Sequence, residues 1–177
     1  MTRINKTLVA LFAVAALFTV LTGSIFAQST ASANGNAEAR IVAGISIAKN
    51  VDLAFGQIVR SASAGTVTLD PSTNQRTAKG GVTLGQNAGF NTASFTVTGE
   101  PEYKFQLTLP KSIDITRQGG KEIMAVNDFT TTLGSSNEGA LDSKGAMDFS
   151  LGATLNVDAN QATGIYDGSF SVTATYQ

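Results

Sequence analysis

The sequence predicts an all-β protein, a single antiparallel β-sandwich of the immunoglobulin-like type. From residue 39 to the end, apolar residues recur at every second position, which is the period of a half-buried strand. No stretch of this region has apolar residues at helical spacing over three turns. Turn-forming residues, including many of the 18 glycines, separate the short strands. Short strands divided by frequent turns are typical of sandwiches.

Each predicted strand is recognised by the apolar residues of one face. Between the two ends of the domain, these faces are Leu53 and Phe55; Val67 and Leu69; Val82 and Leu84; Ala93, Phe95 and Val97; Tyr103, Phe105, Leu107 and Leu109; Ile113 and Ile115; Val126 and Phe129; and Phe149, Leu151, Ala153, Leu155 and Val157. The predicted turns are Asp70-Pro71-Ser72, Gly80-Gly81, Gly99-Glu100-Pro101-Glu102, Gly119-Gly120 and residues 160–164.

The clearest alternation lies at the two ends of the predicted domain. In the first segment, residues 39–48, one face carries Ile41, Ala43, Ile45 and Ile47. In the last segment, one face carries Tyr166, Gly168, Phe170, Val172, Ala174 and Tyr176, with Asp, Ser and Thr between them. The last strand ends one residue before the chain does, so no later strand of this sequence can pair with it. Its partner must therefore be an earlier segment of the same chain or a segment of another molecule.

The first 27 residues have the pattern of a cleaved signal peptide. Arg3 and Lys6 form a basic start, and residues 8–21 form an uncharged apolar run of 14 residues. This run is shorter than the roughly 20 residues that a spanning helix needs. Cleavage is expected after Ala27, or as late as Ala33. We therefore predict a signal peptide at 1–27, a flexible tail at 28–38 and a β-sandwich domain at 39–177, in an exported protein.

The composition excludes several classes of function. The chain has no cysteine and no histidine, which removes disulfides, the commonest general base and the commonest transition-metal ligand. Loss of Arg3 and Lys6 with the leader leaves 10 basic and 13 acidic residues, a net charge of −3. The sequence has no cluster of basic residues, so a nucleic-acid partner is not expected. The leader is the sole segment expected to meet a membrane.

Short motifs do not support an enzyme or a cofactor. Ser46 and Lys49 match an S-x-x-K pattern, but that pattern needs a helix to bring both onto one face, and this segment has the period of a strand. Glu100 and Glu102 flank a proline in a predicted turn, where carboxylates are usually solvated. We expect a protein without enzymatic activity and without a cofactor.

A weak calcium-like spacing occurs before the last strand. Its four oxygen-bearing residues fall at positions 1, 3, 5 and 12 of a calcium-loop count: Asn156, Asp158, Asn160 and Asp167. Position six is Gln161, where the loop needs glycine. A polar loop between the last two strands is the favoured interpretation, and a metal site is not expected.

The last strand resembles the C-terminal strand of chaperone–usher pilin subunits. Gly164 is the fourteenth residue from the end, Tyr176 is the penultimate residue, and Phe170, Val172 and Ala174 fill alternate positions between them. This resemblance implies donor-strand complementation. Gly164, Tyr166, Phe170, Val172, Ala174 and Tyr176 would form the groove, and Ile41, Ala43, Ile45 and Ile47 would form the donor strand.

The chain as a whole resembles an uncharacterised family of small exported bacterial β-sandwich proteins, known as a domain of unknown function. The matching segments are Leu53-Ala54-Phe55-Gly56, Val67-Thr68-Leu69-Asp70-Pro71, Phe95-Thr96-Val97-Thr98-Gly99, Phe149-Ser150-Leu151-Gly152 and residues 164–176. This resemblance implies a pilin-like fold and export.

The sequence leaves two functions open. The first is a surface or fibre subunit that associates with itself or with related subunits, helped by a periplasmic chaperone and an outer-membrane usher. The second is a monomeric secreted module that binds a glycan or Ca²⁺. The lack of the pilin cysteine pair and the number of predicted strands are compatible with a complete sandwich, in which residues 39–48 cover the last strand of their own chain.

Overall fold

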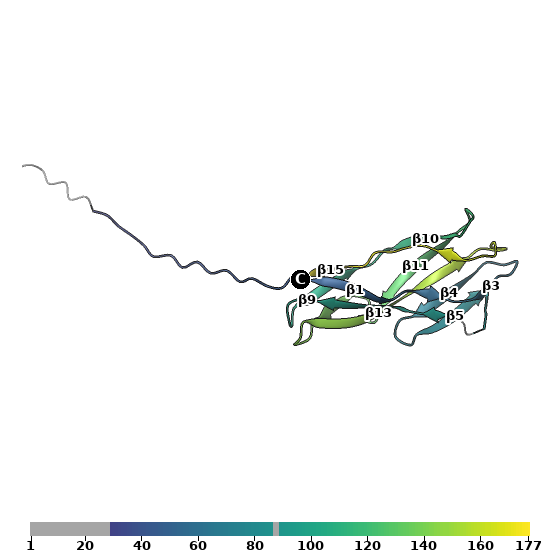
Figure 1. Ribbon diagram of the computed structural model, residues 1–177, viewed down its shortest axis with the longest axis horizontal. Helices are drawn as coiled ribbons and strands as arrows, with labels where there is room; N and C mark the ends of the chain where they lie inside the picture. Colours follow the sequence, from purple (N-terminus) through teal and green to yellow (C-terminus); the bar gives the residue numbers. More distant parts are fainter. Residues whose placement is uncertain (1–28, 87–88) are drawn as a thin grey trace, which may run out of the picture. The chain divides into compact units, whose positions relative to one another are not determined.

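The computed structural model describes residues 29–86 and 89–177; the predicted signal peptide lies outside the described residues. The chain divides into two units, residues 1–40 and residues 41–177. Residues 29–40 of the first unit are exposed and contain no strand or helix. The described residues of the second unit form fifteen strands and no helix, which confirms the predicted all-β class (Figure 1). Accordingly, the described residues include no helix long and apolar enough to cross a membrane.

Eight strands form one antiparallel sheet. Six of them follow the order β1 (Ser46–Val51), β8 (Ala93–Thr98), β13 (Ala146–Val157), β11 (Ile123–Thr131), β10 (Ser112–Arg117) and β14 (Tyr166–Asp167). The other two, β4 (Gly65–Asp70) and β5 (Gln75–Gly80), form a hairpin that joins the sheet where β4 pairs with β13. Strand β1 is therefore one outer edge of the large sheet.

A second antiparallel sheet has three strands, β12 (Glu138–Ala140), β9 (Lys104–Thr108) and β15 (Thr173–Tyr176), in that order. Two further pairs are very short. They are β2 (Ala54–Phe55) with β7 (Phe90–Asn91), and β3 (Ile58–Val59) with β6 (Thr83–Leu84). Apolar residues of the three-stranded sheet pack against those of β8 and β13, so the two sheets form a sandwich.

The central strand β13 holds two cores together. Its first half pairs with β8 and its last four residues pair with β4. The first core, between the two sheets, consists of Ala93, Phe95, Val97, Phe105, Leu107, Leu141, Phe149 and Leu151. The second core, beside the β4–β5 hairpin, consists of Val67, Val82, Val126, Ala153, Leu155 and Val157. Alternation along β13 therefore supplies buried residues to both cores.

The C-terminal segment, predicted as one strand, is two strands in different sheets. Strand β14 pairs with β10 in the large sheet, whereas β15 pairs with β9 in the small sheet. Residues 168–172 connect them and contain no strand. At Gly168 a Cβ would lie 2.9 Å from the Asp114 carbonyl oxygen, so the crossing chain passes close to β10. The alternation in the sequence correctly predicts which side chains of this segment point inward. It does not predict that the chain crosses from one sheet to the other.

Candidate functional site

Strand β15 is the edge of the small sheet. It pairs with β9 through the register Thr173 to Thr108 and Tyr176 to Phe105, and it has no second strand partner within the described residues. An edge strand presents unpaired backbone N–H and C=O groups, which can pair with a strand from another chain. Within the described residues, the outer edge of β15 is thus not paired with another strand.

Strand β1 is an edge as well, and it borders the same core. Within the described residues its one strand partner is β8. The half-buried apolar residues at these two edges all pack against the first core: Ile45, Ile47, Phe170, Val172, Ala174 and Tyr176. We call β1, β15 and these six residues the terminal edge. Figure 1 shows β1, β9 and β15 together beside the C-terminus.

Burial falls from the centre of the first core toward the terminal edge. Phe105 and Val97 are 0% exposed, and Leu107 is 3% exposed. The six residues of the terminal edge are half-buried, although they belong to the same cluster. Phe170, for example, contacts the rings of Phe95 and Phe129 at centroid distances of 6.4 and 5.4 Å. The core is therefore covered less completely on this side.

Three residues connect the start of the second unit, residues 41–177, which we call the β unit, to its end. The Ala43 N–H donates to Glu100 Oε2 at 2.9 Å. The Tyr176 hydroxyl donates to the Ala43 carbonyl oxygen at 2.9 Å and accepts from the Glu100 N–H at 2.6 Å. We call Ala43, Glu100 and Tyr176 the terminal clasp. It fixes both backbone polar groups of Ala43 beside the last residues of β15.

The clasp requires a glycine next to it. A Cβ on Gly99 would lie 2.1 Å from the Tyr176 hydroxyl oxygen, so a larger residue would displace this hydroxyl. The Tyr176 ring also meets the Tyr103 ring edge-on, with centroids 5.4 Å apart. The penultimate tyrosine is thus held by its ring and by its hydroxyl.

The structure brings together four of the six predicted groove residues, Phe170, Val172, Ala174 and Tyr176. Tyr166 lies in β14 instead, where its hydroxyl donates to the Ala162 carbonyl at 2.8 Å and accepts from Gln161 Nε2 at 2.9 Å. Gly164, with φ of 153°, lies against the side chain of Arg117. These two residues belong to the β10–β14 end of the large sheet.

The predicted donor residues fall into two groups. Ile41 is 95% exposed and Ala43 is exposed, and neither lies in a strand. Ile45 and Ile47 are half-buried in the first core, and Ile47 pairs with Val97 of β8. The second group therefore already has partners within its own chain, whereas the side chain of Ile41 does not have an apolar neighbour to cover it.

The weak calcium candidates do not form one cluster. Asn156 directs its amide to Asn127 Oδ1 and the Ala125 carbonyl, at 3.1 and 3.2 Å. Asp167 lies in β14 and pairs with Thr116 of β10. Asp158 and Asn160 lie in the exposed turn after β13. In the part of the chain that the structure describes, no three Asp or Glu residues gather at a point.

In the two short enzyme-like motifs, Ser46, Lys49 and Glu102 are exposed and Glu100 is half-buried. Ser46 Oγ shares a hydrogen bond of 2.7 Å with Thr98 Oγ1, and Lys49 pairs with Asp52. Both residues lie in β1, so their side chains do not share a helical face. Glu100 belongs to the clasp, and Glu102 has the positive φ of 64° of a turn residue.

One exposed ion pair near Gly164 has a strongly shifted carboxylate. Arg117 donates to Glu122 through Nε at 2.7 Å and through Nη2 at 3.0 Å. This hydrogen-bonded pair, with a further contribution from the Glu122 backbone N–H, lowers the pKa of Glu122 from 4.5 to about 2. The pair closes the β10–β11 turn.

This ion pair predicts an acid-dependent loss of stability. The carboxylate of Glu122 titrates at a lower pH in the folded state than in the unfolded chain. Its contribution is therefore complete above pH 4.5 and is lost as the pH falls toward 2. As the pH falls over this range, we expect the urea unfolding midpoint of the Glu122→Gln variant to decrease less than that of the wild type. The pKa of Asp142 is also lowered, by the backbone N–H groups of Ala146 and Lys144. Its protonation should therefore cause part of the fall in urea midpoint in both the wild type and the variant. Equal acid sensitivity of both proteins would contradict this role.

The sequence profile of one protein family matches residues 45–176, and its description is Domain of unknown function (DUF4402). This chain belongs to that family. The DUF4402 match runs from the residue before β1 to the last residue of β15, so it includes both strands of the terminal edge. No curated protein and no solved structure matches the chain. The prediction of an uncharacterised family is confirmed, and the pilin-like role of the last strand stays a prediction.

Proposed function

We propose that this DUF4402 chain is a non-enzymatic, exported structural subunit that assembles at the cell surface by strand addition. The observation that carries the proposal is the terminal edge, where β1 and β15 are edge strands of two different sheets and the apolar residues that cover the first core are half-buried. Such an edge suits an extended segment, which gains backbone hydrogen bonds from the strand and places alternate side chains on the apolar surface. In this proposal Phe170, Val172, Ala174 and Tyr176 line the acceptor.

The proposed donor is the segment at residues 29–42 of a second copy or of a related subunit. This segment contains no strand, and it includes Ile41 and the partly exposed Val42. The terminal clasp favours a second molecule over the same one. Ala43 is held at the end of β15, and β1 starts three residues later. To lie along β15, the same chain would have to reverse within residues 41–43, where the backbone of Ala43 is already bonded.

The expected energy of association has two sources. Burial of an exposed Ile side chain contributes about 1.5–3 kcal/mol, and the backbone hydrogen bonds of an added strand add about 0.5–1.5 kcal/mol each. Ile41 starts at 95% exposure, so nearly all of its surface is available to be covered. Export through the leader, and handling by a periplasmic chaperone and an outer-membrane usher, belong to the same proposal.

The proposal predicts that Ile41→Asp strongly weakens assembly. Loss of about 2–3 kcal/mol of apolar burial weakens association by roughly 30- to 150-fold. We expect unheated surface extracts of the wild type to give SDS-resistant ladders, and the variant to give monomers. Analytical ultracentrifugation of the purified full chain should report the same change.

The matched control is Ile165→Asp. Ile165 is also an exposed isoleucine, at 68%, but it precedes β14 and is not part of the terminal edge. It should leave the ladders unchanged. Wild-type chains that are monomeric in both experiments would disprove assembly, and equal loss in both variants would disprove the assigned donor.

A further inference from the structure

A second feature lies away from the terminal edge, where two paired segments are interrupted. Residues 54–59 run antiparallel to residues 83–91 through β2–β7 and β3–β6. Between these short pairs, Gly56 has a φ of 70° and the pairing stops. Figure 1 shows β3 and β5 at the end of the β unit opposite the C-terminus.

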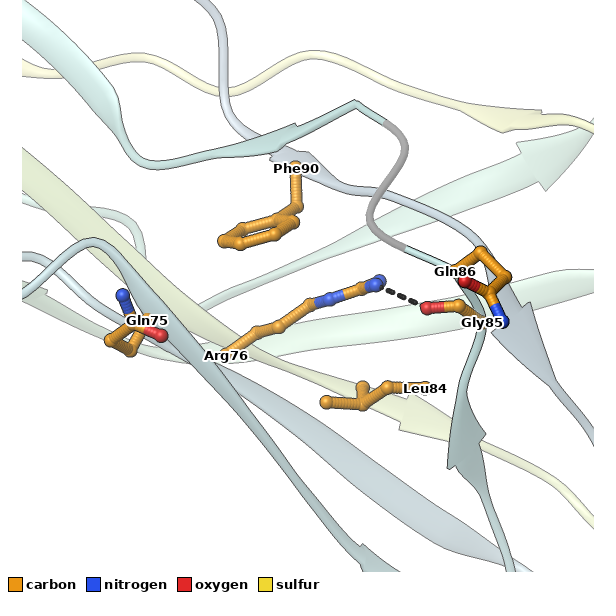
Figure 2. A pocket seen from close by; sticks show the side chains of 6 residues that line it. All are labelled: Gln75, Arg76, Leu84, Gly85, Gln86 and Phe90. Atoms are coloured by element: carbon orange, nitrogen blue, oxygen red, sulfur yellow. Dashed lines mark hydrogen bonds between the residues drawn. The ribbon is translucent and has the colours of Figure 1, made fainter.

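The guanidinium of Arg76, from β5, fills this interruption. Its Nη1 donates to the carbonyl oxygens of Phe55 at 2.9 Å and Gln57 at 2.8 Å. Its Nη2 donates to the Gly85 carbonyl at 2.7 Å. The guanidinium carbon lies 4.7 Å from the centre of the Phe90 ring. Figure 2 shows the Arg76 side chain between Phe90 on one side and Leu84 on the other.

Arg76 is a buried cation that has no counter-ion among the described residues. It is 9% exposed, and no carboxylate of the described residues lies within ion-pair distance. Burial of an ion is unfavourable unless it is paired, and here three carbonyl dipoles and one aromatic ring are its compensation. A guanidinium has five N–H donors, and three are used. Two donors therefore have no partner among the described residues.

A cavity of about 350 Å³ adjoins the guanidinium. Its lining consists of Gln75, Arg76, Leu84, Gly85, Gln86 and Phe90. Figure 2 shows the two glutamine side chains flanking the arginine, so amide groups are available beside the cation. The lining is mainly polar, with the Phe90 ring and the Leu84 side chain as its apolar parts, so the cavity suits a small charged ligand with polar groups.

We propose that this cavity binds a carboxylate-bearing small molecule, whose carboxylate accepts the two remaining N–H groups of Arg76. A carboxylate matches this requirement because it accepts two parallel N–H bonds and supplies the missing negative charge. The body of the ligand lies along Phe90 and meets the amides of Gln75 and Gln86. The carboxylate comes from a uronic acid or from an acidic amino acid. This site is independent of the proposed assembly.

NMR of the purified full chain tests the site directly. The Arg76 Nε–H signal, and the backbone amides of Gly85 and Phe90, should shift saturably with sodium glucuronate or N-acetylaspartate at constant ionic strength. We expect a Kd of about 1–10 mM for a fragment of this size. Glucose and sodium chloride should have no such effect. The acid with the lower Kd shows whether the carboxylate of the ligand belongs to a uronic acid or to an acidic amino acid.

Two variants connect the binding to the guanidinium. Arg76→Lys should weaken binding at least tenfold, because an ammonium cannot donate in the bidentate geometry. Arg117→Lys, the same change at an arginine that does not line this cavity, should leave the Kd within twofold. If Arg76→Lys does not fold, Phe90→Leu retains the guanidinium and should weaken binding about threefold or more. The proposal is overturned if the wild type does not shift saturably, if glucose gives the same shifts, or if a folded Arg76→Lys or Phe90→Leu variant keeps the wild-type Kd.

Discussion

Replacement of Phe105 by alanine is expected to destabilise the β unit by about 3–5 kcal/mol. The Phe105 side chain is 0% exposed and is the largest of the fully buried side chains. It lies in β9, between β12 and β15, and its ring reaches within 2.4 Å of the position that a Cβ on Gly139 would occupy. Removal of the ring leaves a cavity that these strands cannot fill without moving. Urea unfolding of the purified chain measures the loss.

The matched comparison is Phe170→Ala, because Phe170 belongs to the same cluster but is half-buried. A side chain that is already partly solvated leaves a smaller cavity, so its loss should be clearly smaller than that of Phe105. Phe105 is also the pairing partner of Tyr176. We therefore expect faster amide exchange in β15 of the Phe105→Ala protein. A loss below about 1 kcal/mol would show that the first core does not depend on this ring.

Alternation along the sequence predicts the inward faces of the sheets well. All five apolar positions assigned to the strand that contains Phe149 and Val157 are buried, and so are the three assigned to the strand around Phe95. The reason is that period two follows directly from strand geometry, whatever the partner of the strand. For the same reason it does not identify partners, and the assignment of residues 166–176 to one strand missed the crossing between sheets.

Strand β5 was not predicted because its sequence, Gln75–Gly80, is polar. Its fully inward residue is Arg76, and an arginine normally indicates an exposed position. The three carbonyl groups that accept its hydrogen bonds belong to residues 9 to 21 positions away. No local pattern contains that information.

The terminal edge was largely predictable, whereas the terminal clasp was not. The apolar alternation identifies Ile45, Ile47 and the half-buried residues of the last strand without knowledge of the fold. The clasp joins Ala43 to Glu100, 57 positions away, and Glu100 to Tyr176, 76 positions away. The sequence signal at Glu100 is that of an ordinary solvated turn residue. Its role as an acceptor for the backbone of Ala43 follows solely from the pairing of distant strands.

The second large effect is expected at Gly152, where β13 changes partner from β8 to β4. A Cβ at this position would lie 2.1 Å from the Leu69 carbonyl oxygen and 2.8 Å from Pro71 Cδ. The first contact is with backbone, so no side-chain rotation relieves it. Gly152→Ala must therefore move β4 away from β13, which we expect to destabilise the β unit by about 2–4 kcal/mol in urea unfolding.

The control for this substitution is Gly44→Ala. A Cβ on Gly44 meets nothing within 4 Å, and its φ is not in the left-handed region. Alanine there should leave stability unchanged or raise it by up to about 1 kcal/mol, because it restricts the unfolded chain. The difference between the two variants separates the steric requirement at β13 from the general effect of glycine loss. If Gly152→Ala were as stable as Gly44→Ala, β4 could shift freely along β13, and the two cores would not be held in one register by this strand.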